Sequence, residues 1–316
     1  LSGNQVMDGF QRYQGGFSLG GALVKDKTFY YINAEQTVDL KDNLLNVPEL
    51  GINETVRGVS RFTLLSGKLD HVWSPNFRTS VRLNGGYVNI DRQGGGLEGG
   101  TTFPSAGNSQ ARNSFLASVK NTYVGANFTS ETNYQFSRFR WDYGRADNPN
   151  DPQVVAVEQA TGNTLAILGH PGYVFDSREW TNQIQQKFTF YQGAHTIKAG
   201  AEVINANHSL FGGGNPNGNY GVALTEANVQ ALQEINLGAN SQVGDLSSLD
   251  PLVTSYNVEL RPTSFGMAQN IFSLYVEDQW AASNRLNLNL GLRYDYDNLS
   301  QGAADQGDLN NIAPRF

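Results

Sequence analysis

The sequence predicts an all-β fold, and three observations support that prediction. Segments of about ten residues alternate apolar and polar side chains, and successive strand side chains point to opposite faces. Charged residues stay on the polar face of these segments. Short and long connections alternate along the chain, as in antiparallel transmembrane β-barrels with short periplasmic turns and long extracellular loops. We therefore expect about ten meandering strands of a larger barrel.

Composition excludes several classes of protein. The chain has 316 residues and a formal charge of −7, which argues against a nucleic-acid partner because phosphate binding needs a basic surface. It has no Cys, so disulfide frameworks and thiolate chemistry are excluded. No apolar run reaches the roughly 18 residues that a transmembrane helix needs. The chain starts at Leu1 and ends in "NNIAPRF", and we expect it to be a piece of a longer protein.

Five tight turns define the expected strands. The sequences "KDK", "SPN", "VGAN", "QGAH" and "SNR" are each flanked by alternating or β-rich segments, which is the pattern of a hairpin. The ten strands expected from these turns are 16–24, 28–37, 60–72, 77–90, 112–123, 128–141, 179–191, 196–208, 269–281 and 286–297.

Long connections rich in Gly, Asn, Pro and Asp separate the hairpins. They cover 38–59, 91–111, 142–178 and 209–268. The last contains "TEANVQALQEIN", which predicts a short helix with Thr225 as its N-cap. We expect 1–316 to be part of one barrel domain and 209–267 to be a long extracellular loop.

The stretch "LNLNLGLRYDYDN" at 286–298 indicates what the apolar faces contact. Its leucines alternate with Asn, Gly and Arg, and Arg facing lipid would cost about 2–4 kcal/mol at the bilayer midplane. Eleven residues at about 3.3 Å, tilted by about 40°, rise roughly 28 Å, enough for an apolar band of about 25 Å. The leucines are therefore expected to face lipid, with Trp280, Tyr294 and Tyr296 as aromatic residues of the membrane interfaces.

Three places fit the alternation poorly. "TFYYINAEQ" is apolar on both faces at its start, "RFTLLSGKLD" slips in register, and Gln186 falls on the expected lipid face. A β-bulge or an inward-facing aromatic side chain would explain such a segment, and the sequence does not choose between them.

Two stretches resemble TonB-dependent outer-membrane receptors, specifically the Oar-like branch with a carboxypeptidase-regulatory-like N-terminal domain. "GGFSLGGALVKDKTFYYINAEQT" is similar to an early barrel hairpin of that branch, although Ala22 stands where the branch has Pro. "FSLYVEDQWAASNRLNLNLGLRYDYDN", followed by "NNIAPRF", is similar to a mid-barrel hairpin. The residues that carry the resemblance are Gly20, Gly21, Lys25, Asp26, Lys27, Phe29, Glu35, Asp278, Trp280, Gly291, Arg293, Tyr294, Asp295, Asn311, Pro314 and Arg315.

The resemblance implies a barrel of about twenty-two strands with an N-terminal plug, in the outer membrane of a bacterium. It implies energy supplied by the inner-membrane TonB complex through N-terminal parts, and a chain of this kind would lack the plug, the TonB box and the C-terminal strands. The expected partners are outer-membrane lipid, the TonB complex and an unidentified substrate. Siderophores, peptides, glycans and exported proteins all remain open as substrates.

No catalytic, metal or cofactor site is expected. The four His residues have no metal-ligand spacing, and no Ser is paired with a His by any pattern. Substrate recognition would fall to side chains that face the lumen and to loop aromatics, although each could equally serve the structure of the wall. These candidates are Arg78, Arg82, Lys120, Glu131, Lys198, Glu202, Arg293, Tyr173 and Tyr220.

Two rival functions are compatible with the same alternation. A passive porin would have a similar wall and no plug. An extracellular β-sandwich that binds glycans would bring the apolar faces of its strands together across a core, but it gives no reason for the alternation of short and long connections.

Overall fold

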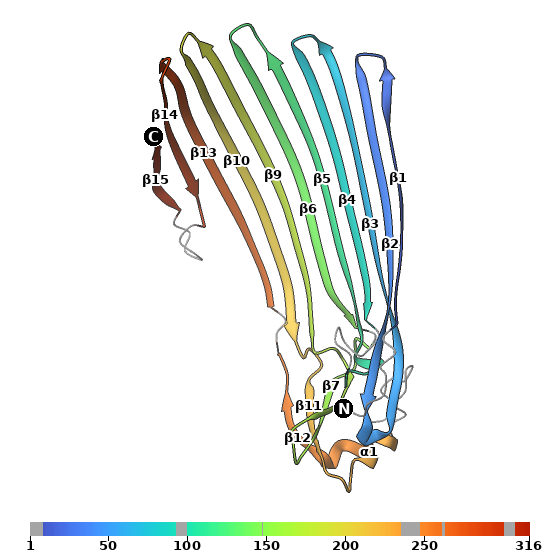
Figure 1. Ribbon diagram of the computed structural model, residues 1–316. Coiled ribbons are helices and arrows are strands. Elements are labelled where there is room, and N and C mark those ends of the chain that lie inside the picture. Colours follow the sequence, from blue (N-terminus) through green and yellow to red (C-terminus); the bar gives the residue numbers. More distant parts are fainter. Residues whose placement is uncertain (1–8, 93–99, 147, 235–246, 261–262, 300–306) are drawn as a thin grey trace.

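The main feature of the computed structural model is one antiparallel sheet of 11 strands in the order β1-β2-β3-β4-β5-β6-β9-β10-β13-β14-β15 (Figure 1). The structure describes residues 9–92, 100–146, 148–234, 247–260, 263–299 and 307–316. The strands are β1 (Phe10–Val24), β2 (Thr28–Val47), β3 (Ile52–Ser74), β4 (Phe77–Arg92), β5 (Asn108–Val124), β6 (Phe128–Ala146), β9 (Tyr173–Gln192), β10 (His195–Gly214), β13 (Thr263–Ser283), β14 (Leu286–Asp297) and β15 (Asp308–Arg315).

The five expected hairpins are confirmed, and their short turns lie together at the top of Figure 1. In the first turn Asp26 adopts a φ of 59° and the Lys27 amide donates to the Val24 carbonyl at 3.1 Å. Gly193 supplies the positive φ of 59° that the β9–β10 turn requires. The long connections lie at the opposite end of the sheet.

Several strands run further than the sequence predicts. β2 continues to Val47 and β3 begins at Ile52, joined by the 3₁₀ helix η1 (Pro48–Leu50). The prediction of a long connection over 38–59 is therefore wrong. Polar residues in this stretch pair across the two strands instead, as in the ion pair of 2.8 Å between Arg57 Nε and Asp42 Oδ1. An eleventh strand, β15, pairs with β14 and adds to the ten strands expected from the turns.

The register tilts the strands relative to the line of turns. Leu83 is opposite Ala117, and Ala117 is opposite Phe136. Leu83 lies six residues beyond the first residue of β4, whereas Phe136 lies eight residues beyond the first residue of β6. Each hairpin is thus displaced by two residues from the previous one, the stagger that barrel closure requires.

The two faces of the sheet differ in polarity. On the face that carries Leu83, Val276 and Leu292, which we call the apolar face, these side chains are 48%, 48% and 49% exposed. The apolar faces of consecutive strands lie side by side on this one face, rather than meeting across a core as the sandwich would predict. The opposite, polar face carries the charged side chains expected of a lumen. On β2 it also carries Phe29 and Tyr31 without a register shift against β3, so the inward-facing aromatic is the correct alternative there.

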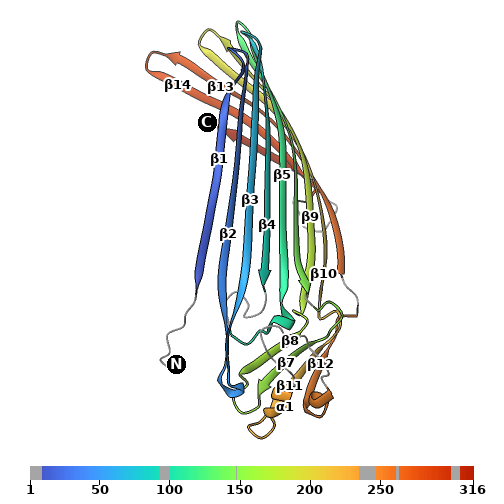
Figure 2. The same cartoon turned by 90° about the vertical axis from the view of Figure 1, so that its right-hand side faces the viewer.

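A second, smaller sheet forms a cap at the end opposite the short turns (Figures 1 and 2). Its order is β12-β11-β7-β8, with β7 (Gln153–Glu158), β8 (Thr164–Gly169), β11 (Asn219–Leu224) and β12 (Val253–Asn257). With it lie η1, η2 (Pro104–Ala106), η3 (Ser247–Leu252) and α1 (Gln230–Glu234). The main cluster of fully buried apolar side chains belongs to this cap and to the ends of β2 and β3, including Leu45, Phe103 and Leu168 at 0% exposure.

The helix expected at 225–236 is shorter than predicted. Thr225 begins a turn in which its carbonyl accepts from the amides of Asn228 and Val229, and α1 follows at Gln230–Glu234. The prediction of Thr225 as the N-cap of this helix is therefore wrong. The last two residues of the expected helix lie outside the described residues. In the described part of the chain, none of the helices has the length and apolarity needed to cross a membrane.

Candidate functional site

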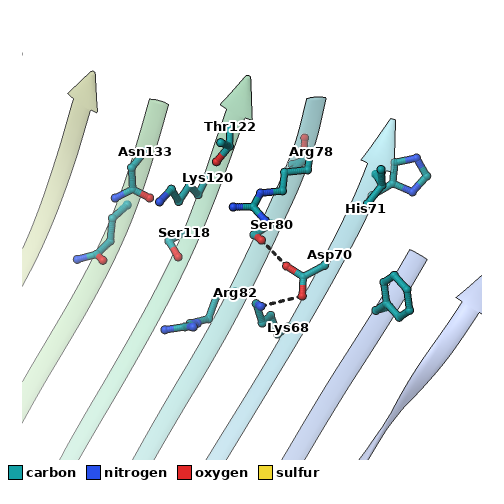
Figure 3. Close-up of a pocket in the computed structure, with 14 residues that line it drawn as sticks. Lys68, Asp70, His71, Arg78, Ser80, Arg82, Ser118, Lys120, Thr122 and Asn133 are labelled. Carbon is teal, nitrogen blue, oxygen red and sulfur yellow. Dashed lines mark hydrogen bonds and ion pairs between the residues drawn. The ribbon is translucent and has the colours of Figure 1, made fainter. Parts of the chain in front are cut away.

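A hollow of about 650 Å³ lies on the polar face across β3, β4, β5 and β6 (Figure 3). Lys68 and Asp70 reach it from β3, Arg78 and Arg82 from β4, and Lys120 from β5. These positions share a face because the strand period is two residues and the register is unbroken here. His71 also borders the hollow, but its ring points away from it in Figure 3, toward Thr28 Oγ1 at 2.8 Å.

Four cationic side chains and one carboxylate line the hollow. Lys68 Nζ is paired with Asp70 Oδ2 at 2.7 Å, and the same carboxylate accepts from the Ser80 hydroxyl. Lys120 Nζ lies 2.6 Å from Glu131 Oε1. Among the described residues, Arg78 and Arg82 have neither an ion pair within 4 Å nor a side-chain hydrogen bond. The hollow therefore carries unbalanced positive charge.

The other predicted lumen residues lie on the same face and are paired. Glu131 links Lys120 to Lys187, whose Nζ is 3.8 Å from Glu131 Oε2. Glu202 Oε1 accepts from Gln183 Nε2 at 2.5 Å. Two further pairs join Lys198 to Glu277 at 3.6 Å and Arg293 to Asp295 at 2.7 Å. The structure thus brings Arg78, Arg82 and Lys120 together and holds the remaining charges in local networks.

The two predicted loop aromatics lie at the cap end of the molecule, away from the hollow. Tyr173 begins β9 at the cap end of the sheet, where its ring lies 5.9 Å from that of Phe175. Tyr220 belongs to β11 of the cap and lies 4.8 Å from Tyr256. No single site joins them to the basic residues.

An aromatic group at the cap end of the polar face was missed by sequence reasoning. The rings of Trp141 and Phe175 are 4.9 Å apart, and those of Tyr143 and Phe175 stack at 5.0 Å. The Arg112 guanidinium lies 4.3 Å from the centre of the Trp141 ring, a cation–π geometry. The alternation of aromatic and polar side chains continues past the predicted end of β6 in "WDY", and this was the signal that could have revealed the group.

The interface aromatics lie on the apolar face. Trp280 stands opposite His195 near the short turn and stacks on that ring at 5.4 Å. Tyr294 and Tyr296 share its face further along β14. Trp73, which the sequence reasoning did not single out, is 62% exposed near another short turn, where its Nε1 donates to Thr79 Oγ1 at 2.9 Å.

The geometry favours binding over covalent chemistry. Cations, hydroxyls and amides line the hollow, and such groups hold and orient a solute through charge and hydrogen bonds. Within the described ranges there is no group of three or more His, Asp or Glu side chains that could hold a metal ion.

Comparisons with known proteins assign the chain to a family. The model of the outer membrane beta barrel domain matches residues 52–315. The TonB-dependent transporter Oar of Myxococcus xanthus is 23% identical, over 95% of this chain and 35% of its own length. The resemblance to Oar-like TonB-dependent receptors is thereby confirmed.

Solved structures share the fold. The outer membrane transporter YddB from Escherichia coli aligns with a TM-score of 0.64 at 15% identity, covering 97% of this chain and 36% of its own. The ferric yersiniabactin uptake receptor FyuA from Yersinia pestis aligns with a TM-score of 0.55 at 10% identity, covering 90% of this chain and 37% of its own. The chain thus spans about a third of the length of these relatives. It belongs to the outer membrane beta barrel domain family and is a bacterial outer-membrane protein.

Proposed function

We propose that the chain forms part of the barrel wall of a TonB-dependent outer-membrane transporter. The similarity to the TonB-dependent transporter Oar over 95% of this chain carries the proposal. The open sheet is consistent with it: β1 and β15 each leave one edge without a neighbour among the described strands. Lipid cannot satisfy such edges, so further strands would close the barrel.

In this proposal the polar face lines the lumen and the apolar face contacts lipid. The TonB complex of the inner membrane supplies the energy for transport, through parts that precede the wall. Arg78, Arg82, Lys120, Glu131, Lys198, Glu202 and Arg293 set the polarity of the lumen, and Tyr173 and Tyr220 lie toward the extracellular side.

A passive porin is the alternative, because a porin would present the same polar wall to water. The two differ in whether the lumen is open at rest. Conductance of potassium chloride through the complete protein in planar bilayers separates them without knowledge of the substrate. We expect a closed lumen that conducts only after the segment upstream of the wall is removed. A steady open conductance in the complete protein would refute active transport and favour the porin.

Direct association with TonB is the second test. The complete protein in detergent should bind the purified periplasmic domain of TonB from the same bacterium. Loss of that binding on removal of the N-terminal parts would support the proposal. Absence of binding by the intact protein would count against energised transport.

A further inference from the structure

We propose that the hollow formed by β3, β4, β5 and β6 is a binding site for an oxyanion group of a transported solute, such as a phosphate, sulfate or carboxylate. This inference deepens the proposed function and rests on it, since it takes the polar face to line a transport lumen. It assigns a chemical class of substrate to Lys68, Arg78, Arg82 and Lys120.

The placement of Arg82 is unfavourable for the sheet alone. Arg82 stands directly opposite Lys68 on β3 and opposite Ser118 on β5. Like charges that face each other across two strands destabilise the pair. Asp70 offsets the charge of Lys68 through its 2.7 Å ion pair, but it does not contact Arg82. A bound anion between the two cations would remove this repulsion.

Arg78 also lacks an ion pair within 4 Å in the part of the chain that the structure describes. Its neighbours across the strands are Val72 and Thr122, and the carboxylates of Asp70 and Glu131 attract it only from a longer distance.

Elsewhere on the same face Lys187, Lys198 and Arg293 have carboxylate partners, as Arg293 has in Asp295 at 2.7 Å. Within the described ranges Arg112 has no carboxylate partner, but it donates to Gln110 and lies over the Trp141 ring. Arg78 and Arg82 differ from these cations in making neither an ion pair nor a side-chain hydrogen bond with any described residue.

The neutral lining supplies the remaining requirements of an anion site. Figure 3 shows Arg78, Arg82 and Lys120 around Ser118. Ser118 and Thr122 carry hydroxyl donors, and Asn133, opposite Lys120, carries an amide donor. A guanidinium presents paired N–H groups that match the oxygens of carboxylate and phosphate, and a hydroxyl beside it adds a further donor.

The positive charge of the hollow is opposite in sign to the net charge of the chain. A protein with a net charge of −7 repels anions on average, so a cationic stretch of the lumen attracts and concentrates them locally. Rings and ladders of Arg and Lys serve this purpose in pores selective for anions and phosphate.

The test measures binding of inorganic pyrophosphate and sulfate to the complete protein in detergent by isothermal titration calorimetry. The double variant Arg78→Gln/Arg82→Gln should weaken binding by about tenfold or more, since each lost charge-assisted hydrogen bond is worth at least that factor. The matched control is Lys25→Gln/Arg285→Gln, which removes two charges from exposed short turns and should bind as the parent does. No binding to the parent protein, or equal loss in both double variants, would overturn the inference.

A stability measurement separates ligand binding from a structural role. Without added anion, Arg82→Gln should keep or raise the unfolding midpoint because it relieves the repulsion with Lys68. A lowered midpoint would mean that Arg82 supports the wall itself and would overturn the inference. Binding in detergent needs no TonB, so loss of pyrophosphate binding with intact TonB association refutes only the anion site. Anion binding together with an open conductance refutes only the active transporter.

Discussion

Replacing Leu83 by arginine would place a guanidinium on the apolar face near the middle of the membrane. Leu83 lies six residues from the start of β4, about 15 Å above the short turns at about 3.3 Å per residue and a tilt of about 40°. That height is close to the centre of an apolar band of about 25 Å. Its cross-strand neighbours are the small residues Gly67 and Ala117, and 48% of Leu83 is exposed. We therefore expect Leu83→Arg to cost about 2–4 kcal/mol of stability.

The adjacent substitution provides the control. Asn84 is on the polar face, opposite Ser66 and Leu116, so Asn84→Arg should change stability by less than about 0.5 kcal/mol. Urea unfolding of the complete protein in phospholipid vesicles measures both variants. Equal losses would show that lipid does not contact the face that carries Leu83, and a larger loss in Asn84→Arg would reverse the assignment of the two faces.

Two further predictions concern the cap. Leu168 has 0% exposure within the cap cluster, so Leu168→Ala should destabilise the protein by about 2–5 kcal/mol. Trypsin should then cleave the cap faster, while the β3–β6 region stays protected. An unchanged rate of cap cleavage would contradict this. His170 is 3% exposed and accepts the Gly172 amide on Nδ1 at 3.1 Å, and burial lowers its pKa. Because the unfolded state then binds the proton more readily, cap stability should be complete above the unfolded pKa of about 6.5 and decline as the pH falls below it. Hydrogen exchange of cap amides at pH 7.5 and 5, expressed as protection factors because the intrinsic exchange rate also changes with pH, checks this. The protection factors of His170→Gln should be alike at both pH values, and an unchanged pH dependence in that variant would assign the effect to another group.

The hairpins were predictable because each is a local feature. A turn such as Lys25–Lys27 and the alternation on both sides of it specify two paired strands without reference to the rest of the chain. The faces of the lumen candidates such as Arg78 and Lys198 followed from the period of two, but the expectation that all charges lie on the polar face is wrong for Asp278, Arg138 and Arg140, which lie on the apolar face. The same reasoning ended β2 too early and began β3 too late, because their outer parts mix charged residues with apolar residues such as Leu45 and Val56, which are buried against the cap.

The cap could not be predicted for the opposite reason. β7 pairs in parallel with β11, so Gln153 lies opposite Asn219, and the intervening chain contains the whole β9–β10 hairpin. No local signal records such a distant contact. Similarly, the sequence placed Arg78 and Arg82 on the lumen face, but it could not show that they lack partners. Pairing depends on the register between strands, and that register is set only when the sheet forms.

The strands of the large sheet follow the order of the chain, and this order has consequences for how the barrel wall assembles and how it acquires insertions. Within the described strands, each hairpin of the large sheet is hydrogen-bonded only to the hairpins before and after it, so strands can be added in the order of the chain without waiting for distant segments. Loop-closure entropy is then small for each step. The cap strands β7 and β8 interrupt the sequence between β6 and β9, yet β6 and β9 pair directly. New surface structure can therefore be inserted at the extracellular end while the wall beneath keeps its register.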